Sequence, residues 1–482
     1  MKFNSALSEK YDVIIIGSGC GGSAAAALAS FNGYRTLLLE KNNLVGGRAC
    51  TRDIQGFKLD HGHIVLRGDK GPHALVLKSI KCEDLIPKYA LLKDLSYRTM
   101  FLGQVWEHSK QSDKRGFRSL RRNIQRSTLS IAEIPALALL SVQLKLRAIR
   151  ENDNWKGLDR VSARSLLLEY TDNEVIDIGL AALTCGCFGV LSDQASCGEW
   201  IRTTQDIIRD DSVGYPVNGE GISAIPNSLL RAAERYGATI ALEAPVERVV
   251  VKQGAVRGVS VGGKLVRSDI VISNAGIKET AFHLVGRSYF DQTYIEYLEK
   301  LSYSSGAISL GYALDRPIVD FHVGFKVPSA FYRNIRDSYD GRLPEQTMMV
   351  LICTSNIDPL LAPRGKQVLL VTAHCPAVRA GKIDWSPWIE SVKRQVEEFV
   401  PGLSRHTIFC QATSPDALAR ENGRILGDAM GVAQTVEQVG ELTPPSASPI
   451  KGLYQVGADV CSKGVGTEMA TQSAIDLFNF LA

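Results

Sequence analysis

Three glycines near the start of the chain have the spacing of a phosphate-binding loop. Gly17, Gly19 and Gly22 lie between an apolar run, Val13 to Ile16, and an alanine-rich stretch from about Ser23 to Asn32. In a strand, loop and helix unit, the first glycine permits a tight turn, the second admits a pyrophosphate and the third packs the helix against the strand. The N–H groups at the helix start then bind the phosphates. We predict that this loop contacts a dinucleotide through Gly17, Ser18, Gly19, Cys20, Gly21 and Gly22.

An acidic residue follows the next predicted strand. This strand covers Thr36 to Leu39 and ends on Glu40, eighteen residues after Gly22. At this distance a carboxylate accepts hydrogen bonds from the ribose of a dinucleotide, and its charge disfavours a 2′-phosphate. An incidental glycine-rich turn is the alternative, but the flanking strand, helix and acid favour a dinucleotide site. We include the adjacent Lys41 among the predicted cofactor contacts.

Two motifs after Glu40 carry a family resemblance. Residues 40–51 read E-x5-G-G-R-x-x-T, and residues 56–62 read GFKLDHG. Together they resemble the signatures of glutathione-reductase-like flavoproteins of the amine oxidase and phytoene desaturase kind, which implies that the dinucleotide is FAD. In that family the positions of Gly46 and Gly47 let the loop pass close to the cofactor, and the position of Arg48 lies near the FAD phosphates or the flavin.

Residues 214–276 contain a pattern that would return the chain to the dinucleotide fold. A predicted helix, Ser223 to Tyr236, precedes several strands that include Val246 to Lys252. In the family that this chain resembles, the backbone at the position of Val246 reaches the adenine. We therefore predict Val246 as a cofactor contact, together with Asn274, which follows the last strand of this region.

The C-terminal stretch, GLYQVGADVCSKGVGTEMATQSAIDLFNFLA, again has the order strand, glycine loop and helix. It resembles the closing flavin signature of the family, in which the positions of Gly457 and Asp459 lie near the ribityl and phosphate groups. A helix that begins at Gly466 and Thr467 would direct its N-terminus at the pyrimidine end of the flavin, where the reduced form carries negative charge. Thr467 departs from the common glycine pair, and Leu59 stands where the family usually has an aromatic residue.

These motifs predict an interleaved α/β protein with two domains. A Rossmann-like FAD-binding domain would comprise residues 8–70, 212–282 and 450–482. A substrate domain of α+β character, with a mixed sheet and helices, would comprise residues 75–210 and 285–448. At 482 residues the chain is long enough for both domains.

Two stretches of the substrate domain, 358–376 and 414–431, resemble phytoene desaturases and related carotenoid- or retinol-modifying oxidoreductases. This resemblance implies an FAD-dependent enzyme that moves hydride between flavin N5 and an apolar, carotenoid-like polyisoprenoid, as a desaturase, saturase or isomerase. No second G-x-G-x-x-G follows a strand, so we predict no separate NAD(P)H domain. Oxygen or a quinone is then the expected electron acceptor.

Two other functions are compatible with this fold. A flavin amine oxidase would need an aromatic cage and a lysine near N5, and neither is evident in the sequence. A non-catalytic prenyl-binding protein of the Rab GDP dissociation inhibitor type has lost FAD, whereas Glu40, the Gly46-Gly47-Arg48 motif and Asp459 are all present here. Both alternatives are therefore disfavoured.

No catalytic acid and base pair is evident, and a hydrocarbon substrate needs little help of that kind. His61 and His63 lie where the family chain passes the flavin. His63 is the tentative catalytic residue, because it would orient the substrate or act as a base. A hydrogen-bonded structural histidine is the alternative, and the one that we favour.

Composition restricts the partners and the location. The net charge of +4 is too small to indicate a nucleic-acid partner, and Cys185, Cys187 and Cys197 lack the spacing of a zinc site, so no metal is expected. The first residues contain no apolar core of a signal peptide, and no apolar run reaches the length of a membrane span. The expected location is cytoplasmic, with a peripheral membrane contact as an option.

That membrane contact would be made by residues 110–150. This segment contains ten lysines and arginines but only two acidic residues, Asp113 and Glu133. The basic residues flank the apolar stretch LSIAEIPALALLSVQLKL. A helix pair on an anionic bilayer, where a lipid-soluble substrate enters, would have this pattern. A solvated basic face above an ordinary core helix explains the pattern equally well.

Liposome flotation separates these two interpretations. The protein is expected to float with anionic liposomes, and the fraction bound is expected to fall when Arg118, Arg121 and Arg122 are all replaced by Glu, because each basic residue near an anionic surface contributes about 1 kcal/mol. Unchanged binding of the triple variant would contradict a role of these arginines in membrane binding.

Overall fold

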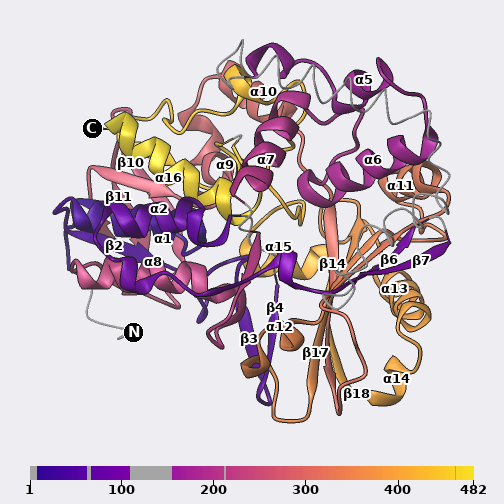
Figure 1. Ribbon diagram of the computed structural model, residues 1–482. Helices are drawn as coiled ribbons and strands as arrows, with labels where there is room; N and C mark the ends of the chain where they lie inside the picture. Colours follow the sequence, from indigo (N-terminus) through magenta and orange to yellow (C-terminus); the bar gives the residue numbers. More distant parts are fainter. Residues whose placement is uncertain are drawn as a thin grey trace.

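The computed structural model describes residues 8–61, 67–101, 103–108, 155–210, 213–461 and 463–481. His63 and the whole 110–150 segment lie outside these residues. Figure 1 shows a parallel sheet flanked by helices on one side of the molecule and a second, larger sheet on the other. The predicted α/β fold class is confirmed.

The first sheet has five strands, all parallel. Their order is β19 (Leu453–Gln455), β13 (Ile270–Ser273), β1 (Val13–Ile16), β2 (Thr36–Leu39) and β9 (Thr239–Ala241). The strands come from three separate stretches of the sequence, and β1 and β2 have the predicted bounds. Every residue of β1 and β2 is buried because both faces of the sheet are covered.

Helices cover one face of this sheet, and they are α1 (Cys20–Phe31), α2 (Pro72–Ser79), α8 (Ala224–Arg235) and α16 (Thr467–Leu481). The alanines at positions 24–27 of α1 are fully buried, since α1 packs between the sheet, α8 and α16. The other face packs against the antiparallel strands β10 (Val246–Lys252), β11 (Ala255–Val261) and β12 (Lys264–Arg267), and against residues 277–301.

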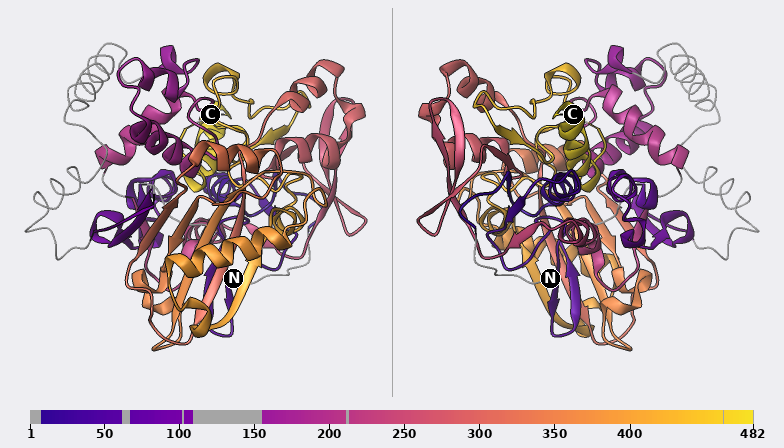
Figure 2. Two further views of the ribbon diagram at one scale, coloured as in Figure 1. Left: turned by 90° about the vertical axis from the view of Figure 1, so that its right-hand side faces the viewer. Right: turned by 90° about the vertical axis from the view of Figure 1, so that its left-hand side faces the viewer.

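The second sheet has seven strands, and only the β15–β6 pair is parallel. Their order is β18 (Thr407–Thr413), β14 (Gly306–Leu314), β17 (Gln367–Cys375), β16 (Met349–Ile352), β15 (Val323–Val327), β6 (Tyr97–Phe101) and β7 (Gln104–His108). Helix α13 (Ser386–Phe399) lies across one face of this sheet, where Trp388, Val392 and Val396 pack on β14, β16 and β17 (Figure 2).

Among the described residues, the opposite face of the second sheet is covered by two groups of elements at its ends and by Leu95 over Val323 and Ile352. The hairpin of β3 (Thr51–Ile54) and β4 (Phe57–Asp60) packs Phe57 and Leu59 against Ala313 and Val368. Helices α6 (Glu174–Phe188) and α11 (Phe331–Tyr339) pack together beside Val327 and Met348. Between these ends the face carries the candidate substrate surface.

The remaining elements connect these layers. They are β5 (Tyr89–Leu91), α5 (Ala163–Leu168), α7 (Cys197–Asp210), β8 (Gly214–Pro216), α9 (Ile277–Glu279), α10 (Gln292–Lys300), α12 (Thr354–Ile357), α14 (Leu403–His406) and α15 (Pro415–Asn422). In the described part of the chain, no helix has the length and apolar character that a membrane crossing requires.

The packing of α1 on β1 gives a stability prediction. A Cβ on Gly22 would lie 2.0 Å from the backbone oxygen of Gly17 and 3.1 Å from Asn274 Cβ. Gly22→Ala is therefore expected to lower the free energy of unfolding by about 1 to 3 kcal/mol, the usual cost of overpacking. Urea denaturation of the purified protein measures this loss.

Gly179→Ala is the matched control, because no atom lies within 4 Å of a Cβ built on Gly179 in α6. This variant is expected to match the wild type or exceed its stability by up to about 1 kcal/mol, since alanine favours a helix. Equal stability of Gly22→Ala and the wild type would contradict the close packing of α1 on β1.

Candidate functional site

The predicted phosphate loop lies between β1 and α1. Helix α1 begins at Cys20 behind Gly19, and no side chain caps it, so its first N–H groups are free to bind phosphate oxygens. Gly17 has φ of +91°, as the tight turn requires. The helix begins three residues before the predicted start at Ser23, so Cys20, Gly21 and Gly22 form its first turn.

Glu40 is buried directly beneath this loop. Its Oε2 accepts hydrogen bonds from Ser18 N at 2.9 Å and Ser18 Oγ at 2.6 Å, and its Oε1 accepts one from Asn42 N at 2.9 Å. The acid therefore fixes the phosphate loop as well as the end of β2. Lys41 is exposed and donates to Arg420 O at 3.1 Å, so its side chain is directed toward α15.

The 243–246 segment runs beside Glu40. Ala244 N donates to Glu40 O at 2.9 Å, and Glu243 N donates to Asn42 O at 3.1 Å. Val246 begins β10 two residues later and is half-buried. The predicted adenine contact is therefore brought next to the predicted ribose contact.

The second glycine loop is joined to the first. Gly46 N donates to both the carbonyl and the hydroxyl oxygen of Ser18, each at 3.2 Å, and Gly19 and Gly46 form a parallel bridge. Gly46 and Gly47 both have positive φ, at +105° and +58°. Arg48 follows them and donates from Nη1 to Ala429 O at 2.8 Å, so it links this loop to residues 428–431.

Asn274 lies at the point where the first loop meets the C-terminal loop. A Cβ on Gly21 would lie 2.7 Å from Asn274 Oδ1 and 2.9 Å from Gly457 N, and a Cβ on Gly19 would lie 2.5 Å from Asn274 Nδ2. Only glycine at positions 19 and 21 permits this approach. The three stretches 17–22, 274–277 and 457–459 are thus in direct contact.

The last helix begins as predicted, at Thr467 after Gly466. Glu468 in its first turn is buried and forms an ion pair with Arg67, with Nε 3.1 Å from Oε1. The positive end of the α16 dipole and Arg67 both favour the Glu468 carboxylate. This pair is not evident from the sequence, because Arg67 and Glu468 are about 400 residues apart.

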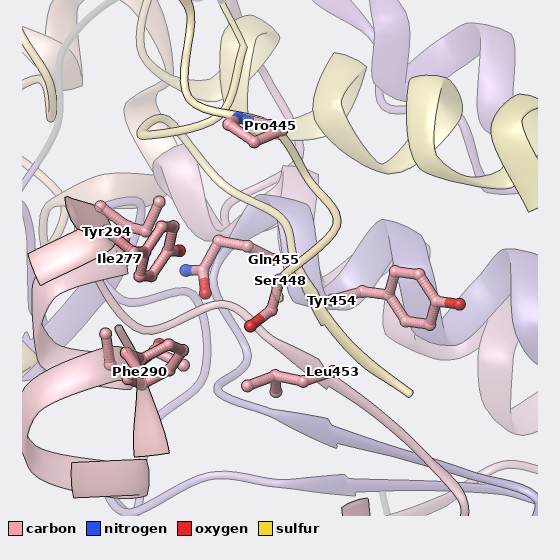
Figure 3. Close-up of a pocket in the computed structure, with 10 residues that line it drawn as sticks. Ile277, Phe290, Tyr294, Pro445, Ser448, Leu453, Tyr454 and Gln455 are labelled. Carbon is pink, nitrogen blue, oxygen red and sulfur yellow. The ribbon is translucent and has the colours of Figure 1, made fainter. Parts of the chain in front are cut away.

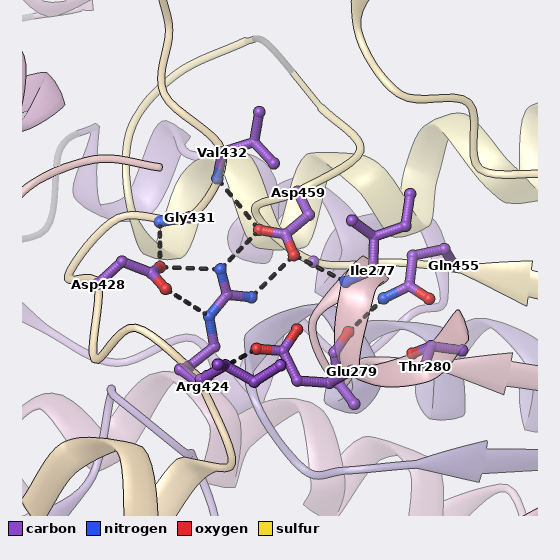
Figure 4. Close-up of polar contacts among 12 residues, drawn as sticks. Ile277, Glu279, Thr280, Arg424, Asp428, Gly431, Val432, Gln455 and Asp459 are labelled. Atoms are coloured by element: carbon purple, nitrogen blue, oxygen red, sulfur yellow. Dashed lines mark hydrogen bonds and ion pairs between the residues drawn. The ribbon is translucent and has the colours of Figure 1, made fainter. Parts of the chain in front are cut away.

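A buried network centred on Arg424 joins the C-terminal loop to residues 428–432 (Figure 4). Arg424 Nη1 and Nη2 donate to the two oxygens of Asp459 at 2.8 and 2.9 Å. The same guanidinium donates to Asp428 at 3.2 Å from Nε and 2.8 Å from Nη2. Both carboxylates are at most 3% exposed, so this ion pair is almost entirely removed from solvent.

Backbone N–H groups complete the coordination of the carboxylates. Ile277 N and Val432 N donate to Asp459 at 2.9 and 3.1 Å, and Gly431 N donates to Asp428 at 3.0 Å. Asp459 was predicted to lie near the ribityl and phosphate groups. In the structure both oxygens of Asp459 accept hydrogen bonds from protein donors. A ligand would therefore contact the backbone around Asp459 rather than its carboxylate.

The charges of the network shift its pKa values. Burial alone would raise the pKa of Asp459, but Arg424, the Ile277 N–H and Arg48 together outweigh burial and hold that pKa below its usual range. Glu279 accepts from Ile425 N at 2.8 Å through Oε1, while its buried Oε2 has no hydrogen-bond partner. Burial raises the pKa of Glu279, and the nearby Arg424 opposes this rise.

The roles of Arg424, Asp428 and Glu279 are not evident from the sequence alone. Arg424 and Asp428 lie four residues apart within the stretch quoted for its resemblance to desaturases, a spacing typical of an ion pair. Such pairs are usually solvated on helix surfaces. Their burial depends on Asp459 and Ile277 from distant parts of the chain, which local spacing does not reveal.

A row of half-buried side chains crosses the face of the seven-stranded sheet opposite α13, and two of them, Phe325 and Val350, pack against the cluster of Leu95, Val323 and Ile352. Paired positions on neighbouring strands place them side by side. They are, in order, Thr99 on β6, Phe325 on β15, Val350 on β16, Thr372 on β17 and Ser309 on β14. At about 4.8 Å between strands the row extends for about 19 Å. We call it the sheet row.

The sheet row lies between the cofactor loops and the β3–β4 hairpin. At one end of β14, Gly306 forms a bridge with Asp428, and Ser305 O accepts from Ala429 N at 3.0 Å. Farther along β14, Leu59 contacts Gly311, where a Cβ would lie 3.1 Å from Leu59 Cδ1. The sheet row is therefore adjacent to the segment that Arg48 contacts.

The other candidate groups are less suited to chemistry. His61 lies 3.8 Å from Glu421 Oε2, and burial lowers its pKa.

A small pocket near Gln455 is lined only by uncharged residues, among them Ile277, Phe290 and Tyr294 (Figure 3). Within the described ranges, no cluster of three or more His, Cys, Asp or Glu residues is placed to hold a metal ion.

A comparison with protein families decides the identity. The model of the flavin-containing amine oxidoreductases matches residues 21–476, which is nearly the whole chain. The chain belongs to this family. It is therefore an FAD-dependent oxidoreductase, and the predictions of an enzyme and of FAD as its cofactor are confirmed.

Curated relatives place the chain close to the carotenoid desaturases. It is 25% identical to the 4,4′-diapophytoene desaturase of Staphylococcus haemolyticus, over 96% of this chain and 97% of that protein. It is 24% identical to pyridine nucleotide-disulfide oxidoreductase domain-containing protein 2 of Rattus norvegicus, over 94% of this chain and 91% of that protein. The predicted resemblance to phytoene desaturase-like members of the superfamily is confirmed.

Solved structures show the same fold. An oxidoreductase from Methanosarcina mazei superposes with a TM-score of 0.71 at 19% identity, over 98% of this chain and all of that chain. A putrescine oxidase has a TM-score of 0.67 at 14% identity, over 98% and 99%. A Rab GDI from Plasmodium falciparum has a TM-score of 0.53 at 14% identity, over 98% of both chains.

The residues present fit FAD. The uncapped start of α1 offers N–H groups to the pyrophosphate, and the close approach of Gly19, Gly21 and Gly457 to Asn274 leaves the loops tightly packed beside it. Glu40 lies below the loop where the ribose would be recognised. Arg48 supplies a positive charge, and burial and then Arg424 lower its pKa.

Removal of Arg424 tests the network. Arg424→Met removes the guanidinium that pairs with both buried carboxylates and leaves only Arg48, 3.6 Å from Asp428, as a counter-ion, so the free energy of unfolding is expected to fall by about 3 to 5 kcal/mol near neutral pH. In the variant these carboxylates have raised pKa values and bind protons on folding, so the deficit is expected to shrink as the pH falls from 8 toward 5. Urea denaturation at several pH values measures both effects.

The control is Arg316→Met. Arg316 is exposed and, within the described residues, pairs with exposed Asp315 alone, so its loss is expected to change stability by less than about 0.5 kcal/mol at every pH. A deficit of Arg424→Met no larger than that of Arg316→Met would contradict a stabilising role for the network.

Proposed function

We propose that this enzyme oxidises, reduces or isomerises an elongated apolar substrate of the polyisoprenoid class, which lies across the sheet row. The observation that carries the proposal is the row itself: five neighbouring half-buried side chains without a charged group, beside the segment that Arg48 contacts. The 4,4′-diapophytoene desaturase relative supports the same substrate class by its name.

Bound FAD would exchange hydride with the substrate through N5. The protein's own contribution is binding and exclusion of water. Phe325 and Val350 provide apolar contacts along the row. Thr99, Thr372 and Ser309 add hydroxyl groups, which are polar but carry no charge. Leu59 closes one end above Gly311. A polyene held flat on this surface is oriented by shape rather than by ion pairs.

An amine substrate fits this surface less well. Amine oxidation benefits from aromatic side chains that surround the nitrogen, and the row contains a single aromatic residue, Phe325. A non-catalytic prenyl-binding role is also disfavoured, because the loops that fit FAD are complete. We propose oxygen or a quinone as the electron acceptor. We also propose that the protein is cytoplasmic and contacts membranes.

Anaerobic titration of the holoenzyme tests the substrate class. Apolar polyenes are expected to bleach the absorption of oxidised FAD if the enzyme desaturates them, or to restore the absorption of prereduced FAD if it saturates them, whereas primary amines are expected to do neither. Bleaching by amines and not by polyenes would overturn the proposal in favour of an amine oxidase.

A charge placed in the row tests its location. Val350→Arg is expected to lower kcat/KM for the active polyene at least about tenfold, since an unpaired guanidinium on an apolar surface must be desolvated by the substrate. FAD content is expected to stay at the wild-type level. Ile408→Arg, at an exposed position of β18, is the control and is expected to keep wild-type kcat/KM. Equal effects of both variants would exclude the row as the substrate surface.

A further inference from the structure

The sheet row continues beyond Thr99 to a tryptophan on the edge strand. Trp106 of β7 pairs directly with Thr99 of β6. Directly paired residues of neighbouring strands point to the same face, so Trp106 lies on the face of the row. Met100, the next residue of β6, packs toward α13 on the other face, as the alternation along a strand requires. Trp106 therefore extends the row by one strand, to about 24 Å from Ser309.

The two ends of the extended row differ in exposure. At the cofactor end, Ser309 pairs with Thr413 of β18, which is buried. At the other end, β7 is the outermost of the described strands, and it lies on the side of the molecule away from the parallel sheet (Figure 1). Its residues Gln104, Val105 and Glu107 are exposed. Among the described residues, the row is thus open at β7.

The cover on both sides of the row reaches only as far as β6. On one side, Phe101 of β6 packs with residues of α6 and α11. On the other side, Tyr97 of the same strand packs with Leu95. Gln104, which pairs with Phe101 on β7, is exposed, so the cover by α6 and α11 ends before β7. A molecule that continues along the row past β6 would lie over Trp106.

The type of residue at this position indicates an apolar contact. Edge strands commonly carry charged side chains, because an apolar edge associates with other chains. Trp106 is instead large, uncharged and half-buried, between two exposed neighbours. An indole ring presents a broad and rigid apolar face, and a buried aromatic side chain removes about 150 to 250 Å² from water. An apolar chain that covered Trp106 would therefore be stabilised there.

We propose that Trp106 binds the part of the substrate that lies farthest from the flavin, so that the substrate enters across the β7 edge and long chains are preferred to short ones. This inference rests on the proposed function, because it assigns the far end of the molecule on the sheet row. The near end lies beside the bridge of Gly306 with Asp428. Only a molecule that extends from β14 to β7 contacts both ends.

The test compares two hydrocarbon probes of different length, squalene and β-farnesene, in the same detergent. Extended squalene reaches from β14 to β7, and β-farnesene does not. Each probe is titrated anaerobically into the holoenzyme, and the shift of the FAD absorption bands reports binding next to the flavin. Trp106→Ala is expected to weaken the binding of squalene at least about tenfold, which corresponds to about 1.4 kcal/mol, and to leave the affinity for β-farnesene unchanged.

Two further variants separate the contact from effects on folding. Trp106→Phe keeps an aromatic face and is expected to retain most of the affinity for squalene. Val105→Ala is the matched control, because Val105 is the adjacent residue of β7, is 55% exposed and points to the opposite face. This control is expected to bind both probes like the wild type. The FAD content of all three variants is expected to equal that of the wild type.

The outcomes distinguish this inference from the proposed function. Wild-type affinity of Trp106→Ala for squalene, or an equal loss of affinity for both probes, would overturn the role of Trp106 while leaving an apolar substrate on the sheet row. If neither probe shifts the FAD bands of the wild-type holoenzyme, the polyisoprenoid substrate class itself fails, and the assignment of Trp106 fails with it.

Discussion

The buried guanidinium of Arg424 holds together parts of the chain that must meet for the site to exist. It joins Asp459 of the C-terminal loop to Asp428 of the segment beside the sheet row, while Ile277 N binds the same Asp459 carboxylate. Two anions and one cation without solvent are unfavourable unless every partner is present. The network therefore forms only when the cofactor loops and the substrate sheet are correctly positioned, and it fixes their separation.

That fixed separation also determines what lies beside the proposed substrate surface. The strand β14 begins at the bridge between Gly306 and Asp428 and then carries Ala307 and Ser309 across the sheet. Arg48 reaches the same segment from the second glycine loop. A molecule on the sheet row consequently lies next to the part of the protein that fits the flavin, and the β3–β4 hairpin limits how far it extends along β14.

Much of the dinucleotide fold follows from local patterns. The bounds of β1 and β2 were predicted from continuous apolar runs, since strands buried on both faces carry such runs, and glycine spacing located the turn before α1. The sheet row was not predictable, because it depends on which residues of five separate strands share one register. The Arg424 network escaped prediction for the same reason. The assignment of His63 lies outside the described residues and stays a prediction.

The account predicts a specific location for the substrate, and a crystal structure of the holoenzyme with a bound, slowly reacting polyisoprenoid analogue tests it most directly. The analogue is expected to lie across β6, β15, β16, β17 and β14, in contact with Phe325, Val350 and Thr372, with one end beside the loop that contains Asp428. Density for the analogue elsewhere, with the sheet row empty or covered by protein, would contradict the account.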